Sequence, residues 1–127
     1  MPTIYISQPM SGRSEAEIIE ERNRAVEEII KIYGADVEIC DNYHTDCERN
    51  IVASTTLQYN TNHDLYWLGE ALKVLSWADV IWFCADWEFS RGCKIENMAA
   101  LFYGVERVYP WSAIRAKMKN EGNEEDN

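Results

Sequence analysis

The sequence predicts a small doubly wound α/β domain, in which a parallel sheet of about four to five strands carries helices on both faces, as in flavodoxin-like and Rossmann-like folds. Strand-like and helix-like segments alternate along the chain, which favours parallel strands joined by helices. Residues 78–85 (ADVIWFCA) are almost continuously apolar, which is typical of a central parallel strand covered on both faces. The 127 residues are enough for one domain with one core.

The first elements are a strand, a helix and a second strand. Residues 3–7 (TIYIS) predict a buried strand, and residues 36–40 (DVEIC) predict the next one. Between them, Ser14 and Glu17 have the spacing of a helix capping box, and Gly34 is a natural C-terminal stop. The apolar residues of this helix repeat with a helical period on one predicted face: Ile18, Ile19, Ala25, Val26, Ile29, Ile30 and Tyr33.

A helix resumes near residue 63, and its leucines predict a buried stripe: Leu65, Leu68, Leu72 and Leu75. After the strand at 78–85 we expect a loop over 86–92 (DWEFSRG), a helix over 93–103 ended by Gly104, and a last strand over 105–111. We therefore expect one domain over residues 1–115, followed by an acidic, disordered tail over 116–127.

Residues 41–61 are polar and follow no firm period, so we expect an excursion with at most one short helix. A segment of this length in a small domain is either functional or poorly ordered, and a lid carrying Tyr43 and Tyr59 is one such function. His44 lies near Asp46 and Cys47, but their spacing is not that of a metal site, so no metal is predicted.

The composition limits the partners. The net charge of −10, from 22 acidic and 12 basic residues, argues against nucleic-acid polymers and acidic membranes. It is compatible with a small anion held by one arginine and a few backbone N–H groups. No apolar run is long enough to span a membrane and no secretory signal is visible. The four cysteines form no CxxC pair, which indicates reduced thiols in a cytoplasmic protein.

Two loops are the expected ligand site. In an open α/β sheet, ligands bind beyond the carboxyl ends of the strands, where the strand order reverses. If the first strand is central, residues 7–13 (SQPMSGR) and 86–92 (DWEFSRG) face each other there. Each loop carries a Ser, a Gly and an Arg, and each leads into a helix N-terminus. These features favour an anion, although ordinary turn chemistry explains each Gly or Ser taken singly.

Glu96 is the candidate reactive group. It falls in the first turn or so of the helix after the second loop, where a helix N-terminus stabilises the charged form of a carboxyl. An ionised carboxylate facing a crevice is what a glycosidic nucleophile requires. A solvated or capping glutamate at this position is the alternative.

Two segments resemble the nucleoside 2-deoxyribosyltransferase-like superfamily, and most closely a short phage- and bacterium-associated branch of unknown function. They are IYISQPMSG at the start and ADVIWFCADWEFSRGCKIENMAALFYG later, with YWLG at 66–69 between them. The resemblance covers roughly residues 3–40 and 64–109. It implies a homodimer or larger homo-oligomer that needs no cofactor. It also implies cleavage of the N-glycosidic bond of a nucleoside or nucleoside 5′-monophosphate, by hydrolysis or by transfer.

The resemblance also implies site residues. Glu96 matches the nucleophile, Tyr5 matches a tyrosine that lies beside it, and Ser90 and Gly92 match a phosphate-binding loop. Trp87 would wall the pocket or stack on the base, with a place in the core as the equal alternative. The full set expected to bind substrate is Ser7, Gln8, Pro9, Met10, Gly12, Arg13, Asp41, Trp87, Ser90, Arg91 and Gly92.

One position departs from the superfamily pattern. An aspartate that helps with the leaving base or the sugar is expected where this chain has Ala71. Asp41, Asp64 or Asp86 would have to replace it, or the chemistry is altered or absent. The alternatives to an enzyme are therefore a protein that binds or sequesters a nucleotide or an ADP-ribose-type signal, and a partner-binding protein that binds no nucleotide.

Overall fold

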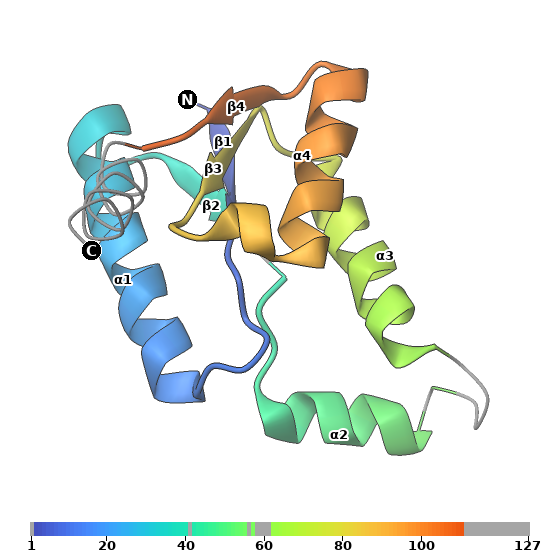
Figure 1. The fold of residues 1–127 in the computed structure, drawn as a ribbon. Helices are drawn as coiled ribbons and strands as arrows, with labels where there is room; N and C mark the ends of the chain where they lie inside the picture. The colour runs from blue at the N-terminus through green and yellow to red at the C-terminus, as the bar shows by residue number, and fades with distance from the viewer. Residues whose placement is uncertain (1, 41, 56, 58–61, 111–127) are drawn as a thin grey trace, which may run out of the picture.

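Four parallel strands in the order β2-β1-β3-β4 form the centre of the protein (Figure 1). The structure is a computed structural model that describes residues 2–40, 42–55, 57 and 62–110. The strands are β1 (Thr3–Ser7), β2 (Glu38–Cys40), β3 (Val80–Phe83) and β4 (Glu106–Val108). This order, with β1 inside the sheet, confirms the predicted small doubly wound α/β fold.

The two inner strands explain the apolar sequence of 78–85. β1 pairs with β2 on one side and β3 on the other, so that Tyr5 aligns with both Cys40 and Ile81. All four residues of β3 are buried. β2 and β4 form the edges of the described sheet, and Glu38, Glu106 and Arg107 on them are exposed.

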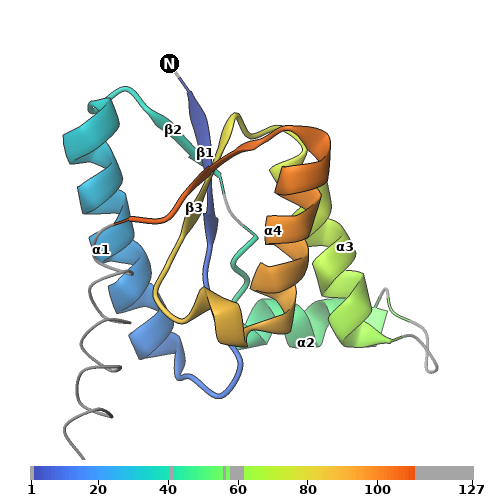
Figure 2. The same ribbon diagram turned by 45° about the horizontal axis from the view of Figure 1, so that its top comes forward.

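Helices cover both faces of the sheet (Figure 2). α1 (Glu15–Tyr33) packs on one face, whereas α3 (His63–Leu75) and α4 (Arg91–Tyr103) lie on the other. One core cluster, around Ile4, Ile29 and Trp82, lies under α1, and a second contains Tyr5, Leu75, Ile81, Phe83 and Ala100. The helix α2 (Asp46–Thr55) lies beyond the carboxyl ends of the strands (Figure 1).

Capping residues set the helix boundaries. Ser14 caps α1 by accepting the N–H of Glu17, as the capping box predicts, and the positive φ of Gly34 (98°) ends the helix. α4 begins at Arg91 rather than at residue 93, because the Ser90 side chain accepts the N–H of Cys93. The predicted loop before it contains a 3₁₀ turn, η1 (Trp87–Phe89). The last three strands are shorter than predicted.

Three residues predicted to be buried are exposed. Ile19 is 42% exposed and Ile30 is 39% exposed, because neighbours on a helix point about 100° apart and Ile18 and Ile29 already face the sheet. Leu65 is 63% exposed, since it lies in the first turn of α3, near the end of the sheet. The leucine stripe of α3 is thus buried toward its C-terminal end, at Leu75.

None of the four cysteines is in a disulfide bond, and Cys84 and Cys93 are buried. Burial raises the pKa of Cys93 to about 11, so this thiol stays protonated at neutral pH. In the described ranges no helix is both long and apolar enough to cross a membrane. The predicted tail, Asp41 and Tyr59 lie outside the described residues.

Candidate functional site

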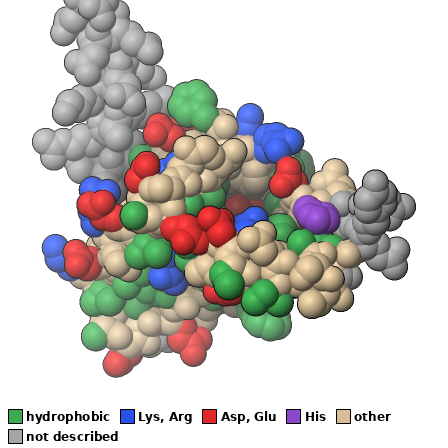
Figure 3. Space-filling model, turned by 90° about the horizontal axis from the view of Figure 1, so that it is seen from below, with side chains coloured by type: hydrophobic (Ala, Val, Ile, Leu, Met, Phe, Trp, Pro, Cys, Tyr) green, Lys and Arg blue, Asp and Glu red, His purple; other side chains and the backbone are tan. Residues whose placement is uncertain are grey.

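The two loops singled out in the sequence meet at the carboxyl end of the sheet. β1 and β3 are neighbours, and their pairing continues past the strand ends, where the Cys84 N–H donates to the Ser7 carbonyl at 3.0 Å. The chain after β1 turns into α1 on one face, and the chain after β3 turns into α4 on the other. This is the point where the strand order reverses. Figure 3 shows the molecule from this side, with a hollow near the middle of the face and acidic side chains beside it.

Glu96 faces the sheet from α4. The residues of α4 that are buried are Cys93, Glu96 and Ala100, spaced three and four apart on one side of the helix. Glu96 is only 5% exposed, and its Oε1 accepts a hydrogen bond from the Ser7 hydroxyl at 3.2 Å. Its Oε2 is buried and receives no hydrogen bond from any described residue. A carboxyl group therefore lies inside the protein with one oxygen left for a further partner.

Burial controls the charge of this carboxyl group. It raises the pKa of Glu96 to about 7, although hydrogen bonds from Tyr5 and Ser7 act to lower it. We expected the N-terminus of α4 to stabilise the charged form of Glu96, and this expectation is wrong. Glu96 is the sixth residue of α4, beyond the first turn where the helix dipole acts strongly, and desolvation dominates. The alternative of a solvated or capping glutamate is equally wrong.

Tyr5 and Ser7 reach Glu96 from β1 because side chains alternate along a strand. Residues 5 and 7 face α4, whereas Ile4 and Ile6 belong to the core under α1. Ser7 was predicted to contact substrate, yet it is 1% exposed and its hydroxyl is bound to Glu96. Its place in the structure is that of a residue that holds the carboxylate.

The loop after β1 is fixed to α1 through Glu21. The Gln8 amide donates to Glu21 Oε1 at 3.0 Å and to the Ile18 carbonyl at 2.8 Å. The Arg13 guanidinium donates from one nitrogen to the same Oε1 and to the Pro9 carbonyl, both at 2.8 Å. The hydrogen bond to Glu21 is the main reason that the pKa of Arg13 is raised.

Sequence reasoning missed Glu21. It is one of several acidic residues in α1, and no spacing separates it from the others. Gly12, with φ of 75°, lets the loop turn back so that Arg13 can reach Glu21. The Arg13 N–H also donates to the Met10 carbonyl at 3.2 Å, which closes the turn. Pro9 and Met10 are half-buried parts of this turn.

The second loop leaves space at the start of α4. Ser90 caps the helix, so its hydroxyl has the ordinary turn role that the sequence also allowed. A Cβ atom built on Gly92 would meet no atom within 4 Å apart from its chain neighbours and the nearby backbone of its own helix, so there is room for a side chain at this helix terminus. Arg91 is directed to Asp64 at the start of α3, and the two exposed side chains are 3.6 Å apart.

Trp87 packs in an aromatic cluster at the end of β3. Its ring centroid is 4.9 Å from that of Phe83 and 5.3 Å from that of Tyr109. The Tyr109 hydroxyl donates to the Asn97 side chain on α4 at 2.5 Å. Trp87 is half-buried, so it is both part of the core and part of the rim of this face.

The described part of residues 41–61 contains the helix α2, as expected, and α2 is held at both sides. The Asp46 N–H donates to Glu15 of α1 at 2.7 Å. On the other side the Arg49 guanidinium lies 5.0 Å above the Trp67 ring of α3, and the His44 ring lies 4.8 Å from it. The two ring nitrogens of His44 lie 3.1 Å from Asn42 and 3.2 Å from Glu48. Asp46 and Cys47 are exposed at the start of α2.

The expected residues thus form three groups. The first group lies inside the protein and consists of Glu96, Tyr5 and Ser7. The second consists of Gln8 and Arg13, which both contact Glu21. The third is Arg91, which lies apart from the others beside Asp64. Ala71 is buried, Asp64 and Asp86 are exposed, and Asp41 lies outside the described residues. No second carboxyl group of the described residues is hydrogen-bonded to Glu96.

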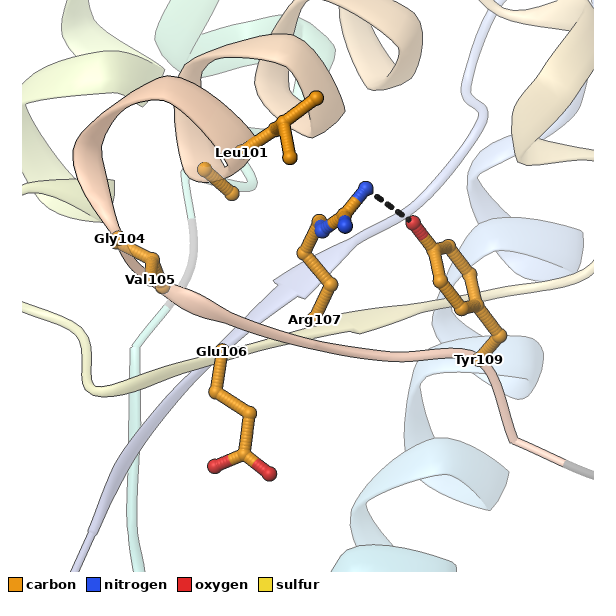
Figure 4. Close-up of a pocket in the computed structure, with 7 residues that line it drawn as sticks. Leu101, Gly104, Val105, Glu106, Arg107 and Tyr109 are labelled. Carbon is orange, nitrogen blue, oxygen red and sulfur yellow. Dashed lines mark hydrogen bonds between the residues drawn. The ribbon is translucent and has the colours of Figure 1, made fainter.

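A separate hollow of about 340 Å³ lies between the C-terminal end of α4 and β4 (Figure 4). Leu101, Gly104, Arg107 and Tyr109 are among the residues that line it. None of the predicted site residues lines it, so it is distinct from the Glu96 site.

No protein-family model matches this chain, and neither a curated protein nor a solved structure matches it significantly.

Proposed function

We propose that the carboxyl end of the sheet binds a nucleoside or nucleoside 5′-monophosphate, and that Glu96 cleaves its N-glycosidic bond. The observation that carries this proposal is the Glu96 carboxyl group, buried at the point where the strand order reverses, with Oε1 held by Ser7 and Oε2 unpaired. A buried oxygen without a partner is costly, and a bound substrate would give it one.

The reaction consists of two displacements. The ionised Glu96 carboxylate attacks C1′ through an oxocarbenium-like transition state, the C1′–N bond breaks, and the base leaves with the electron pair and takes a proton from water. Water then attacks C1′ and releases the sugar, which restores the carboxylate; a second base in place of water gives transfer. In this proposal Ser7 and Tyr5 fix the direction of Glu96, and Arg13 and the Gly92 backbone hold the 5′-phosphate of the substrate.

Only the ionised form of Glu96 can attack. Because its pKa is about 7, the rate of base release is expected to rise as the pH increases from 6 to 8.

A nucleotide-binding protein without turnover is the second candidate. Ala71 is buried where the superfamily that the sequence resembles is expected to have an acid, and no second carboxyl group of the described residues is bonded to Glu96. Without general-acid help to the leaving base, the rate falls by roughly 10²–10⁴-fold. Such a pocket would hold a nucleotide or an ADP-ribose-type signal rather than cleave it.

Product analysis tests both candidates. The protein is incubated with nucleosides, their 5′-monophosphates and NAD, and the free base is measured by chromatography while calorimetry measures binding. The enzyme predicts base release that Glu96→Gln reduces by at least about 10³-fold, with binding retained. Glu20→Gln, on the exposed face of α1, is the matched control. Binding without base release from the unmodified protein supports the second candidate, and the absence of both overturns the proposal.

A further inference from the structure

The Cys93 thiol is a buried group at the candidate site that the proposed reaction does not use. It is 2% exposed and lies three residues before Glu96, on the same buried side of α4. Its side chain is hydrogen-bonded to the hydroxyl groups of Ser7 and Ser90. Ser7 ends β1 and Ser90 caps α4, so Cys93 connects the two loops of the candidate site beneath their surface.

The donors and acceptors of these groups fix the direction of the hydrogen bonds. The Ser7 hydroxyl gives its hydrogen to Glu96 Oε1 at 3.2 Å, so toward Cys93 it can only accept. The thiol supplies that hydrogen, because burial raises the pKa of Cys93 to about 11 and keeps it protonated at neutral pH. The Ser90 oxygen accepts the Cys93 N–H at 3.3 Å, which leaves the Ser90 hydrogen for the Cys93 sulfur. We call this series, from Ser90 through Cys93 and Ser7 to Glu96, the relay.

We propose that Cys93 is a positioning residue, which acts through Ser7 to hold Oε1 of Glu96, so that Oε2 is the oxygen that attacks C1′. This inference rests on the proposed function. A serine hydroxyl can rotate, and the thiol beside Ser7 leaves its hydrogen one direction, toward the carboxylate. Hydrogen bonds in a chain strengthen one another, so the relay also favours the ionised form of Glu96. Oε2 is buried and receives no hydrogen bond from any described residue, which leaves its lone pairs for the substrate.

The ionisation of Glu96 tests this positioning without a substrate. Tyr5 and Ser7 on β1 and Cys93 on α4 are the described groups that face Glu96. Carbon-13 NMR follows its carboxyl carbon, and the signal that is absent from Glu96→Gln identifies it. The unmodified protein should titrate near pH 7, and Cys93→Ala about 0.5 pH units higher, because the ionised form loses support. A merely structural loss would admit water and lower the midpoint instead.

Two further variants control for the loss of a buried thiol. Cys93→Ser keeps a donor to Ser7 and should titrate within about 0.2 pH units of the unmodified protein. Cys84→Ala removes another buried thiol, which belongs to the core under α1, and should titrate like the unmodified protein as well. An unchanged or lowered midpoint in Cys93→Ala overturns the proposal. An equal rise in Cys93→Ser or in Cys84→Ala also overturns it.

Base release tests whether this positioning serves the reaction. At pH 7, Cys93→Ala should lower kcat about 3–10-fold with KM nearly unchanged, and Cys93→Ser should keep the rate of the unmodified protein. Because Cys93 acts through Ser7, adding Cys93→Ala to Ser7→Ala should cause no further loss. An equal loss in both backgrounds overturns the proposal. If the unmodified protein releases no base, the proposed function fails, and the NMR titration still decides whether Cys93 holds Glu96.

Discussion

At the scale of single residues, Glu21 organises more of the candidate site than any residue that the sequence singled out. One of its oxygens accepts from both Gln8 and Arg13, and through them it sets the shape of the loop after β1. Arg13 uses a single nitrogen for its contacts with Glu21 and Pro9. The rest of its guanidinium group is thus held in one direction and can pair with a phosphate.

Substitution of Glu21 and Arg13 together tests this dependence. Each of Glu21→Ala and Arg13→Ala should weaken binding of a nucleoside 5′-monophosphate by about 10-fold, with little effect on the nucleoside. If Glu21 acts through Arg13, the double variant should bind no more weakly than Arg13→Ala alone. Calorimetric titration of the four proteins gives the coupling. Additive losses, or equal losses for nucleoside and monophosphate, would contradict it.

The same residues show how far a sequence can predict a site. Ser7, Gln8 and Arg13 were singled out from the sequence because they follow a strand in a distinctive loop. Their partners were not predicted, since Ser7 bonds to a residue 89 positions away and Glu21 looks like any other acid of α1. The protonation of Glu96 was missed for a related reason, because desolvation depends on packing that helix position alone does not reveal.

At the scale of elements, a substitution at the start of α4 is expected to change phosphate binding without lowering the stability of the protein. A Cβ built on Gly92 meets no atom within 4 Å beyond its chain neighbours and the nearby backbone of its own helix, and the φ of Gly92 is not positive, so the fold does not need glycine there. Gly92→Ala should leave the protein equally stable, or more stable by up to about 1 kcal/mol. It should nevertheless weaken phosphate binding, because the methyl group would occupy the space at the helix terminus. Denaturant unfolding and nucleotide titration together check this, and unchanged binding would contradict it.

The attachment of α2 to α3 depends on the Trp67 ring. Trp67→Leu keeps an apolar side chain but removes the contacts with Arg49 and His44. We expect amide hydrogen exchange in residues 46–55 to become about 3–10-fold faster, since a cation–π contact contributes about 0.5–1 kcal/mol and the His44 ring contact adds to it. Exchange in α1 should stay unchanged. Trp77→Leu, at an exposed tryptophan beyond α3, is the control, and equal effects of the two substitutions would contradict the assignment.

Prediction of the elements succeeded where the signal is local. The Ser14 capping box, the stop at Gly34 and the apolar run of β3 all lie where the sequence placed them. The exposure of Leu65 was missed because helical spacing shows which side of a helix is apolar but not where the sheet beneath it ends.

At the scale of the whole molecule, the buried carboxyl group makes stability depend on pH. The folded pKa of Glu96, about 7, lies above its ordinary value of 4.5. The stabilisation is therefore complete below pH 4.5 and is lost as the pH rises through 7. Relative to Glu96→Gln, which does not titrate, the unmodified protein should lose about 2–3 kcal/mol between pH 5 and pH 8. Urea unfolding at the two pH values measures this loss, and a constant difference would show that Glu96 is not buried as described.

The edges of the sheet also affect how whole molecules meet. β2 and β4 have three residues each, and charged side chains stand on both. Another chain that tried to add its backbone there would find few groups to pair with and charges beside them. Stacking into amyloid-like ribbons is therefore disfavoured, and concentrated solutions of this protein should stay clear.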